Sequence, residues 1–123
     1  MENKIINSKE HLNLNRIREH SNGDCDFLID IYSEFLLELP KKMTAIEILI
    51  QDNKKEEILK ICHNLVGIFP MFGMESSLKI LLDIKLHLKQ KGIDNSIQKK
   101  LLKLDLILKD VLLEIEIELT QLT

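Results

Sequence analysis

The chain has 123 residues, of which 45% are hydrophobic and 30% charged, and its net charge is −3 at pH 7. This length and composition predict one globular domain over residues 1–123, with its core at about 12–119, and exclude a disordered chain. The slightly acidic net charge gives no basic field that would attract nucleic acid, so we expect no nucleic-acid binding. The two cysteines are too few for a disulfide scaffold. No apolar run is long enough for a secretory signal or a membrane span, so we expect no membrane binding and a cytoplasmic location.

The first half of the chain predicts a short helix at about 12–20 and then a long one. Gly23 suits the left-handed residue that stops the first helix, and Asp24 can cap the second. Apolar residues then recur at three- and four-residue spacing as far as Asp52, and Pro40 predicts a kink within them. These apolar residues are Phe27, Leu28, Ile31, Tyr32, Phe35, Leu36, Leu39, Met43, Ile46, Leu49 and Ile50.

The second half predicts three more helices. Asn53 and Glu56 form a capping-box pattern before a helix that carries His63, and Pro70 predicts that this helix bends or stops near Phe69. A helix over Glu75–Lys91 follows and ends at Gly92. Asp94 or Ser96 can then cap a last helix that runs to about Leu119.

The last helix is apolar almost all round, which favours either a central helix or a second buried face between two copies of the chain. Short connections between successive helices favour antiparallel neighbours. The predicted fold is therefore all-α: an antiparallel up-down four-helix bundle with an additional short N-terminal helix.

His63 is the outstanding candidate for chemistry. At about 100° per residue, it projects opposite the apolar stripe of its helix. Gly67 follows one turn later on the same side, although glycine within a helix costs about 1 kcal/mol relative to alanine. Its missing side chain would open the imidazole to a docking partner. The apolar stripe comprises Ile58, Ile61, Leu65, Ile68 and Phe72, flanked by Leu59, Cys62, Val66 and Phe69.

This stretch resembles the histidine phosphotransfer (HPt) domains of two-component phosphorelays. The family motif reads His, any residue, Leu, Lys, Gly, with a second Gly six residues after the first; His63, Leu65, Gly67 and Gly73 match it. The resemblance extends over the chain from about Leu12 onward. The further matches are Gly23-Asp24 before Phe27-Leu28, Phe35-Leu36 before Pro40, and Gly92.

Two positions depart from the family pattern. Val66 stands where the family has a lysine that favours the phosphoryl group, and Ile68 stands where a small polar residue is usual. Lys60, one turn before His63, either supplies the missing charge or is an ordinary solvated lysine. Met71 is a candidate for an exposed apolar docking patch beside His63, with Phe69 as the other candidate.

The resemblance implies a phosphorelay phosphocarrier and phosphoprotein in signal transduction rather than an enzyme. His63 would accept a phosphoryl group from the phosphoaspartate of a receiver domain, on a response regulator or a hybrid histidine kinase, and pass it to another receiver. The chain would need no cofactor of its own, because the receiver brings the magnesium ion.

The alternative is an HPt-like binding module that docks on such partners and transfers phosphate poorly. Neither function requires a metal site in this chain. Cys62 and His63 are adjacent and diverge by about 100° on a helix, and His11, His20 and His87 read as surface residues without an acidic or thiol partner.

Overall fold

The computed structural model describes residues 11–123, and within this range the chain is all-helical, with no strand. The predicted all-α class is confirmed. The elements are α2 (Asn15–Ser21), α3 (Cys25–Gln51), α4 (Lys55–Ile68), the 3₁₀ turn η1 (Phe69–Phe72), α5 (Glu75–Lys91) and α6 (Asn95–Leu122).

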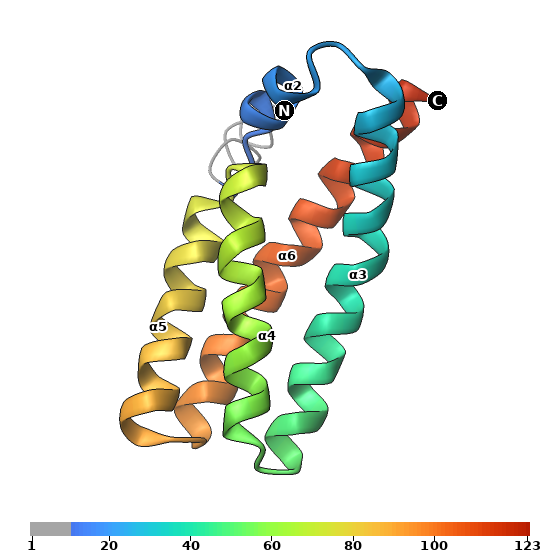
Figure 1. The fold of residues 1–123 in the computed structure, drawn as a ribbon. Coiled ribbons are helices and arrows are strands. Elements are labelled where there is room, and N and C mark those ends of the chain that lie inside the picture. The colour runs from blue at the N-terminus through green and yellow to red at the C-terminus, as the bar shows by residue number, and fades with distance from the viewer. Residues whose placement is uncertain (1–10) are drawn as a thin grey trace.

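The four long helices lie side by side, and successive ones run in opposite directions (Figure 1). α3 packs against α4 and α6, and α5 packs against the same two helices. α4 and α6 therefore stand diagonally across the apolar core from each other. The short helix α2 covers the end of the four helices near η1 and contacts both α3 and η1. Each long helix buries one stripe of apolar side chains and leaves its opposite side to solvent.

Two of the predicted helix caps form. The Asp24 carboxylate accepts a hydrogen bond from the Phe27 amide (3.2 Å), and the Asp94 carboxylate accepts one from the Ile97 amide (3.2 Å). The capping box predicted at Asn53 is wrong. Asn53 has φ of 57° and forms the turn itself, so the N-cap position falls to Lys54, which makes no side-chain cap bond. Asparagine tolerates this left-handed backbone, which explains its place there.

The second predicted helix is one continuous element that includes Pro40. α3 runs unbroken for 27 residues, or about 40 Å, with Pro40 on its exposed side. The first predicted helix is shorter than expected, because the Asn13 side chain accepts a hydrogen bond from the Asn15 amide (3.0 Å) and α2 starts only there.

The end of α4 is as the sequence predicts. α4 stops at Ile68, and Pro70 lies in the first turn of η1, where its missing N–H costs no helical hydrogen bond. The ring of Phe72 then stacks on Phe35 of α3, with ring centroids 4.1 Å apart. This contact fixes the end of the α4–η1 segment against α3.

Gly73 is required by the fold. Its φ is +63°, and a Cβ there would collide with the backbone and side chain of Asn13 and lie 2.8 Å from the Asn13 amide nitrogen. That amide donates a hydrogen bond to the Phe72 carbonyl (3.0 Å), so the Asn13 segment cannot move away without losing it. Close approach and a left-handed backbone together exclude a side chain at this position.

We expect Gly73→Ala to lower the free energy of unfolding by about 2 kcal/mol or more, because it adds a clash to the cost of about 1 kcal/mol for a left-handed alanine. Gly23 is the matched control: its φ is +81°, but a Cβ would meet nothing within 4 Å. Gly23→Ala should therefore cost only the backbone term. Urea denaturation of the two variants measures the difference, and equal losses would contradict the packing role of Gly73.

No helix within residues 11–123 combines the length and the apolar character needed to cross a membrane.

Candidate functional site

The rotation of α4 about its own axis decides which side chains form the candidate site. Ile58, Cys62, Leu65 and Phe69 are almost completely buried, each at most 1% exposed. Their stripe spans an arc of about 60° and includes Cys62, which the sequence placed on the flank. Ile61 and Ile68, predicted at the centre, are only half-buried.

His63 lies on the exposed side of α4, as predicted. Within residues 11–123, its ring takes part in no hydrogen bond or ion pair. Both ring nitrogens are therefore uncommitted. The site thus offers an exposed imidazole on a regular helix that is anchored by its buried side.

Two of the other three histidines are engaged elsewhere. His11 Nδ1 lies 3.1 Å from Ser76 Oγ, and His87 Nε2 lies 2.9 Å from both carboxylate oxygens of Asp94. The interpretation of His87 as a surface residue without an acidic partner is wrong, since its side chain is only 10% exposed. The pair joins the C-terminal part of α5 to the start of α6, and the hydrogen bond from His87 lowers the pKa of the Asp94 carboxyl. His20 is exposed, in the short α2.

The space beside Gly67 is open. A Cβ at this position would meet nothing within 4 Å, so packing inside the chain gives no reason for glycine here, in contrast to Gly73. In projection, Gly67 lies about 40° from His63 on one side and about 100° from Ile68 on the other. The exposed surface therefore continues from His63 across Gly67 towards α3.

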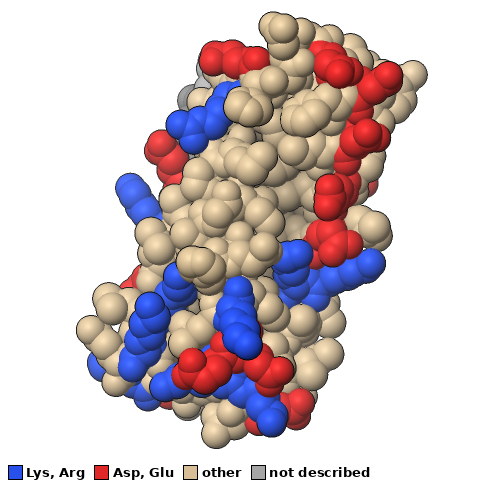
Figure 2. All heavy atoms as spheres, in the orientation of Figure 1, with Lys and Arg blue, Asp and Glu red and all other residues tan. Residues whose placement is uncertain are grey.

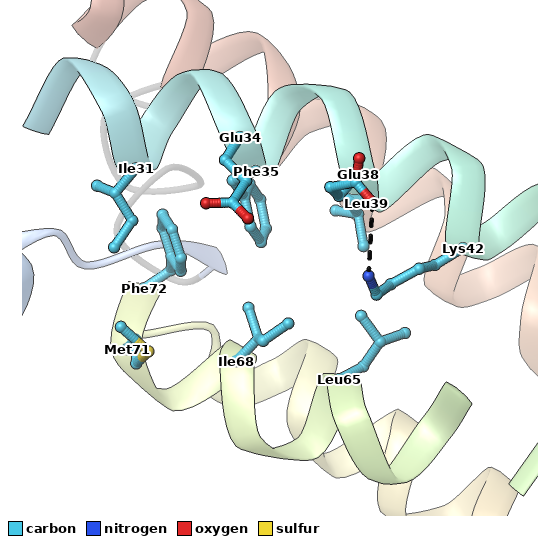
Figure 3. A pocket seen from close by; sticks show the side chains of 10 residues that line it. All are labelled: Ile31, Glu34, Phe35, Glu38, Leu39, Lys42, Leu65, Ile68, Met71 and Phe72. Atoms are coloured by element: carbon cyan, nitrogen blue, oxygen red, sulfur yellow. Dashed lines mark ion pairs between the residues drawn. The ribbon is translucent and has the colours of Figure 1, made fainter. Parts of the chain in front are cut away.

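A groove of about 200 Å³ lies on that side, between α3 and the α4–η1 segment. Figure 3 shows that α3 supplies one wall and α4 with η1 the other, and that Phe72 reaches across to α3 near Phe35, towards the end of the groove marked by Ile31 and Met71. Most of the lining is apolar. Glu34, Glu38 and Lys42 on α3 add charges to the lining, and Glu38 and Lys42 are 4.0 Å apart. The apolar lining residues are Ile31, Phe35, Leu39, Leu65, Ile68, Met71 and Phe72.

Met71 and Phe69 have different surroundings. Met71 is 39% exposed and lines the groove, so it is the apolar side chain available to a partner, as predicted. Phe69 is completely buried, which makes it wrong as a candidate for the patch. The turn from α-helix to η1 at Phe69 changes the direction in which the next side chains point.

Three positions bear on positive charge near His63. Val66 is half-buried, and Lys60 is exposed one turn before His63. Lys85, on α5, was not singled out from the sequence as a cation near the site. Burial raises the pKa of the Cys62 thiol to about 11, and the charge of Lys85 acts in the opposite direction. Lys85 therefore lies close enough to Cys62, the residue before His63, to act electrostatically on the Cys62 thiol. A protonated, buried thiol is neither a nucleophile nor a metal ligand.

The charges on this face are unevenly distributed. Figure 2 shows many basic side chains, with a few acidic ones among them, over the half of the face where α4 begins, and a largely uncharged half towards η1. Acidic side chains follow the edge formed by the first half of α3. The face is thus an uncharged area with a predominantly basic side and an acidic border.

The described residues hold no group of three or more His, Cys, Asp or Glu side chains that could bind a metal ion. Comparison with models of known protein families, with curated proteins and with solved structures finds no match to this chain.

Proposed function

We propose that this chain is a phosphorelay phosphocarrier of the histidine phosphotransfer type, with His63 as the phosphoacceptor. The observation that carries the proposal is the exposed, unpaired imidazole of His63 beside the open space at Gly67. We further infer that α3, α4, α5 and α6 form the up-down antiparallel four-helix bundle expected from the sequence, with α2 as the additional helix.

In the proposed reaction, a ring nitrogen of neutral His63 attacks the phosphorus of a receiver phosphoaspartate. The N–P bond forms as the P–O bond to the aspartate breaks, and the electron pair of that bond leaves with the receiver carboxylate. Attack by the carboxylate of a second receiver reverses these steps. Histidine suits this task because its neutral form is an available nucleophile near neutral pH.

The chain contributes position rather than a catalytic constellation. Phosphoryl transfer passes through a loose transition state, in which alignment and charge stabilisation do most of the work. The receiver would supply the magnesium ion and the acidic pocket. On this account the chain is no enzyme by itself and needs no cofactor.

The surface around His63 suits such a partner. The groove beside Gly67 can take apolar side chains of a docking helix, with Met71 as an adaptable contact. The lysines on the same face have the opposite sign to an acidic receiver pocket. Docking would thereby bring the phosphoaspartate over the imidazole.

A binding module that docks without accepting phosphate is the second candidate. Val66 favours it, because no cation stands one turn after His63. Incubation with phosphorylated receiver domains separates the two functions: stable binding without acid-labile phosphate on this chain would identify the binding module.

His63→Gln should abolish phosphate acceptance from a phosphorylated receiver. The free energy of unfolding should change by less than about 0.5 kcal/mol, because the residue is exposed and unpaired. Radiolabel transfer and circular dichroism measure the two effects, and His20→Gln is the control on another exposed histidine. Unchanged labelling of the His63→Gln variant would show that His63 is not the phosphoacceptor.

Gly67 should show opposite effects on function and stability. Gly67→Ala and Gly67→Gln should each stabilise α4, by up to about 1 kcal/mol, because glycine is a poor helix former and a Cβ meets nothing here. Only the bulky Gln should slow transfer severely, by blocking the approach of a partner. The rates of both variants with the same receiver test this, and equal rates for Gln and the parent would show that clearance is irrelevant.

Val66→Lys should increase the yield or lifetime of phosphohistidine if positive charge is limiting, because a cation one turn away favours the phosphoryl group. If Lys60 or Lys85 already supplies that charge, Lys60→Ala or Lys85→Ala should lower the yield and Val66→Lys should add little. All three variants should be measured with one receiver. No change in any of them would mean that charge from this chain does not limit transfer.

A further inference from the structure

α6 carries a second apolar face that its own fold leaves uncovered. Leu102, Leu106, Leu113 and Ile117 are 62%, 57%, 57% and 45% exposed. Their spacing of four, seven and four residues places them within an arc of about 60°, directly opposite the buried stripe of α6. They form one straight seam along the outside of the helix rather than scattered exposures.

The size of this seam suits an interface. Four half-exposed Leu and Ile side chains present on the order of 400 Å² of apolar surface, which is close to the apolar share of the roughly 800 Å² that each partner gives to a standard interface. Its four- and seven-residue spacing is that of helices that pack side by side.

The charges beside the seam identify the occupant. Lys109 and Asp110 lie midway along it, about 50° to either side of its centre line. Lys109 has an ion-pair partner in its own helix, Asp105 at 3.9 Å, whereas Asp110 has none within residues 11–123. The seam is therefore positive on one side and negative on the other at the same height, which makes it complementary to a copy of itself.

We propose that two copies of the chain associate through α6 in parallel and in register. A two-fold axis parallel to the helices brings the Lys109 side of each copy against the Asp110 side of the other. Two Lys109–Asp110 ion pairs between the copies can therefore form, because the two residues lie only one position apart along the helix axis. An antiparallel pair with overlapping seams would instead bring Lys109 against Lys109 and Asp110 against Asp110.

The charged residues further from the centre line of the seam form both favourable and unfavourable pairs in this arrangement. Parallel pairing also brings Lys103 near Asp105 of the other copy, but it sets Glu114 near Glu116. These residues lie about 70° to 90° from the centre line, where solvent screens them. Lys99 projects about 30° from the centre line but lies one turn before Leu102, outside the length of the seam. Among the charges within the length of the seam, Lys109 and Asp110 lie nearest the centre line and set the orientation.

This dimer leaves the candidate site free. α6 stands diagonally across the core from α4, and α3 and α5 each pack against both of them. Both copies would therefore present His63 on faces that point away from the interface, so the proposal does not depend on the phosphocarrier function and its failure would leave that function untouched.

Sedimentation equilibrium of the chain tests the proposal. We expect a dimer at concentrations of about 100 μM and a monomer for Leu106→Lys/Leu113→Lys, with Leu82→Lys/Leu86→Lys on the exposed face of α5 as the control that remains dimeric. Circular dichroism establishes that each variant is folded. A monomeric parent at this concentration, or a control that dissociates equally, would overturn the proposal.

Charge exchange tests the orientation. Lys109→Asp and Asp110→Lys each create two like-charge pairs and should weaken the dimer at least tenfold, whereas the double exchange should restore it. Leu106→Cys, in a Cys25→Ser background, should form a disulfide between copies, because Leu106 meets its own equivalent only in the parallel arrangement. The parallel orientation would be excluded if the double exchange failed to restore dimerisation. It would also be excluded if Leu106→Cys formed a disulfide only with Leu113→Cys of another copy.

Discussion

The candidate site depends on the rotation of α4 about its axis. The stripe from Ile58 to Phe69 is buried against the other helices, and burying such a stripe contributes several kcal/mol, at roughly 1.5–3 kcal/mol for each large side chain. His63 projects about 130° away from the centre of that stripe, so it must point outward. A rotation that buried His63 would expose Cys62 and leave an imidazole without a partner in the core.

The end of α4 is held as firmly as its buried side. Phe72 stacks on Phe35, and the Asn13 amide bonds the Phe72 carbonyl while Gly73 leaves room for that segment. The groove beside the candidate site is built from the same residues, since Phe35 and Phe72 form part of its lining. The contacts that terminate α4 thus also shape the surface that we propose for docking. Glycine is therefore present at the two motif positions for different reasons: Gly73 leaves room that the fold requires, whereas Gly67 keeps the outer surface beside His63 clear.

Much of this arrangement follows from the sequence, because periodic apolar residues and local caps act over a few residues. The bounds of α5, the caps at Asp24 and Asp94 and the exposure of His63 are of this kind. The errors arise where a local pattern competes with a tertiary contact or a turn. Asn53 resembled a cap but forms a left-handed turn, and Phe69, one turn after Leu65, continues the buried stripe of α4 instead of the exposed surface. The His87–Asp94 pair, the position of Lys85 near Cys62 and the groove itself join residues from different helices, which no single stretch of sequence reveals.

The most direct test of the account is to locate phosphate on the chain after incubation with phosphorylated receiver domains. Tandem mass spectrometry at neutral to alkaline pH preserves phosphohistidine and distinguishes among His11, His20, His63 and His87. The account predicts acid-labile phosphate on His63 alone, because His11 and His87 are engaged in other contacts and His20 lies outside the proposed docking face. Phosphate on another residue, or none on His63 while a bound receiver retains its own, would contradict it.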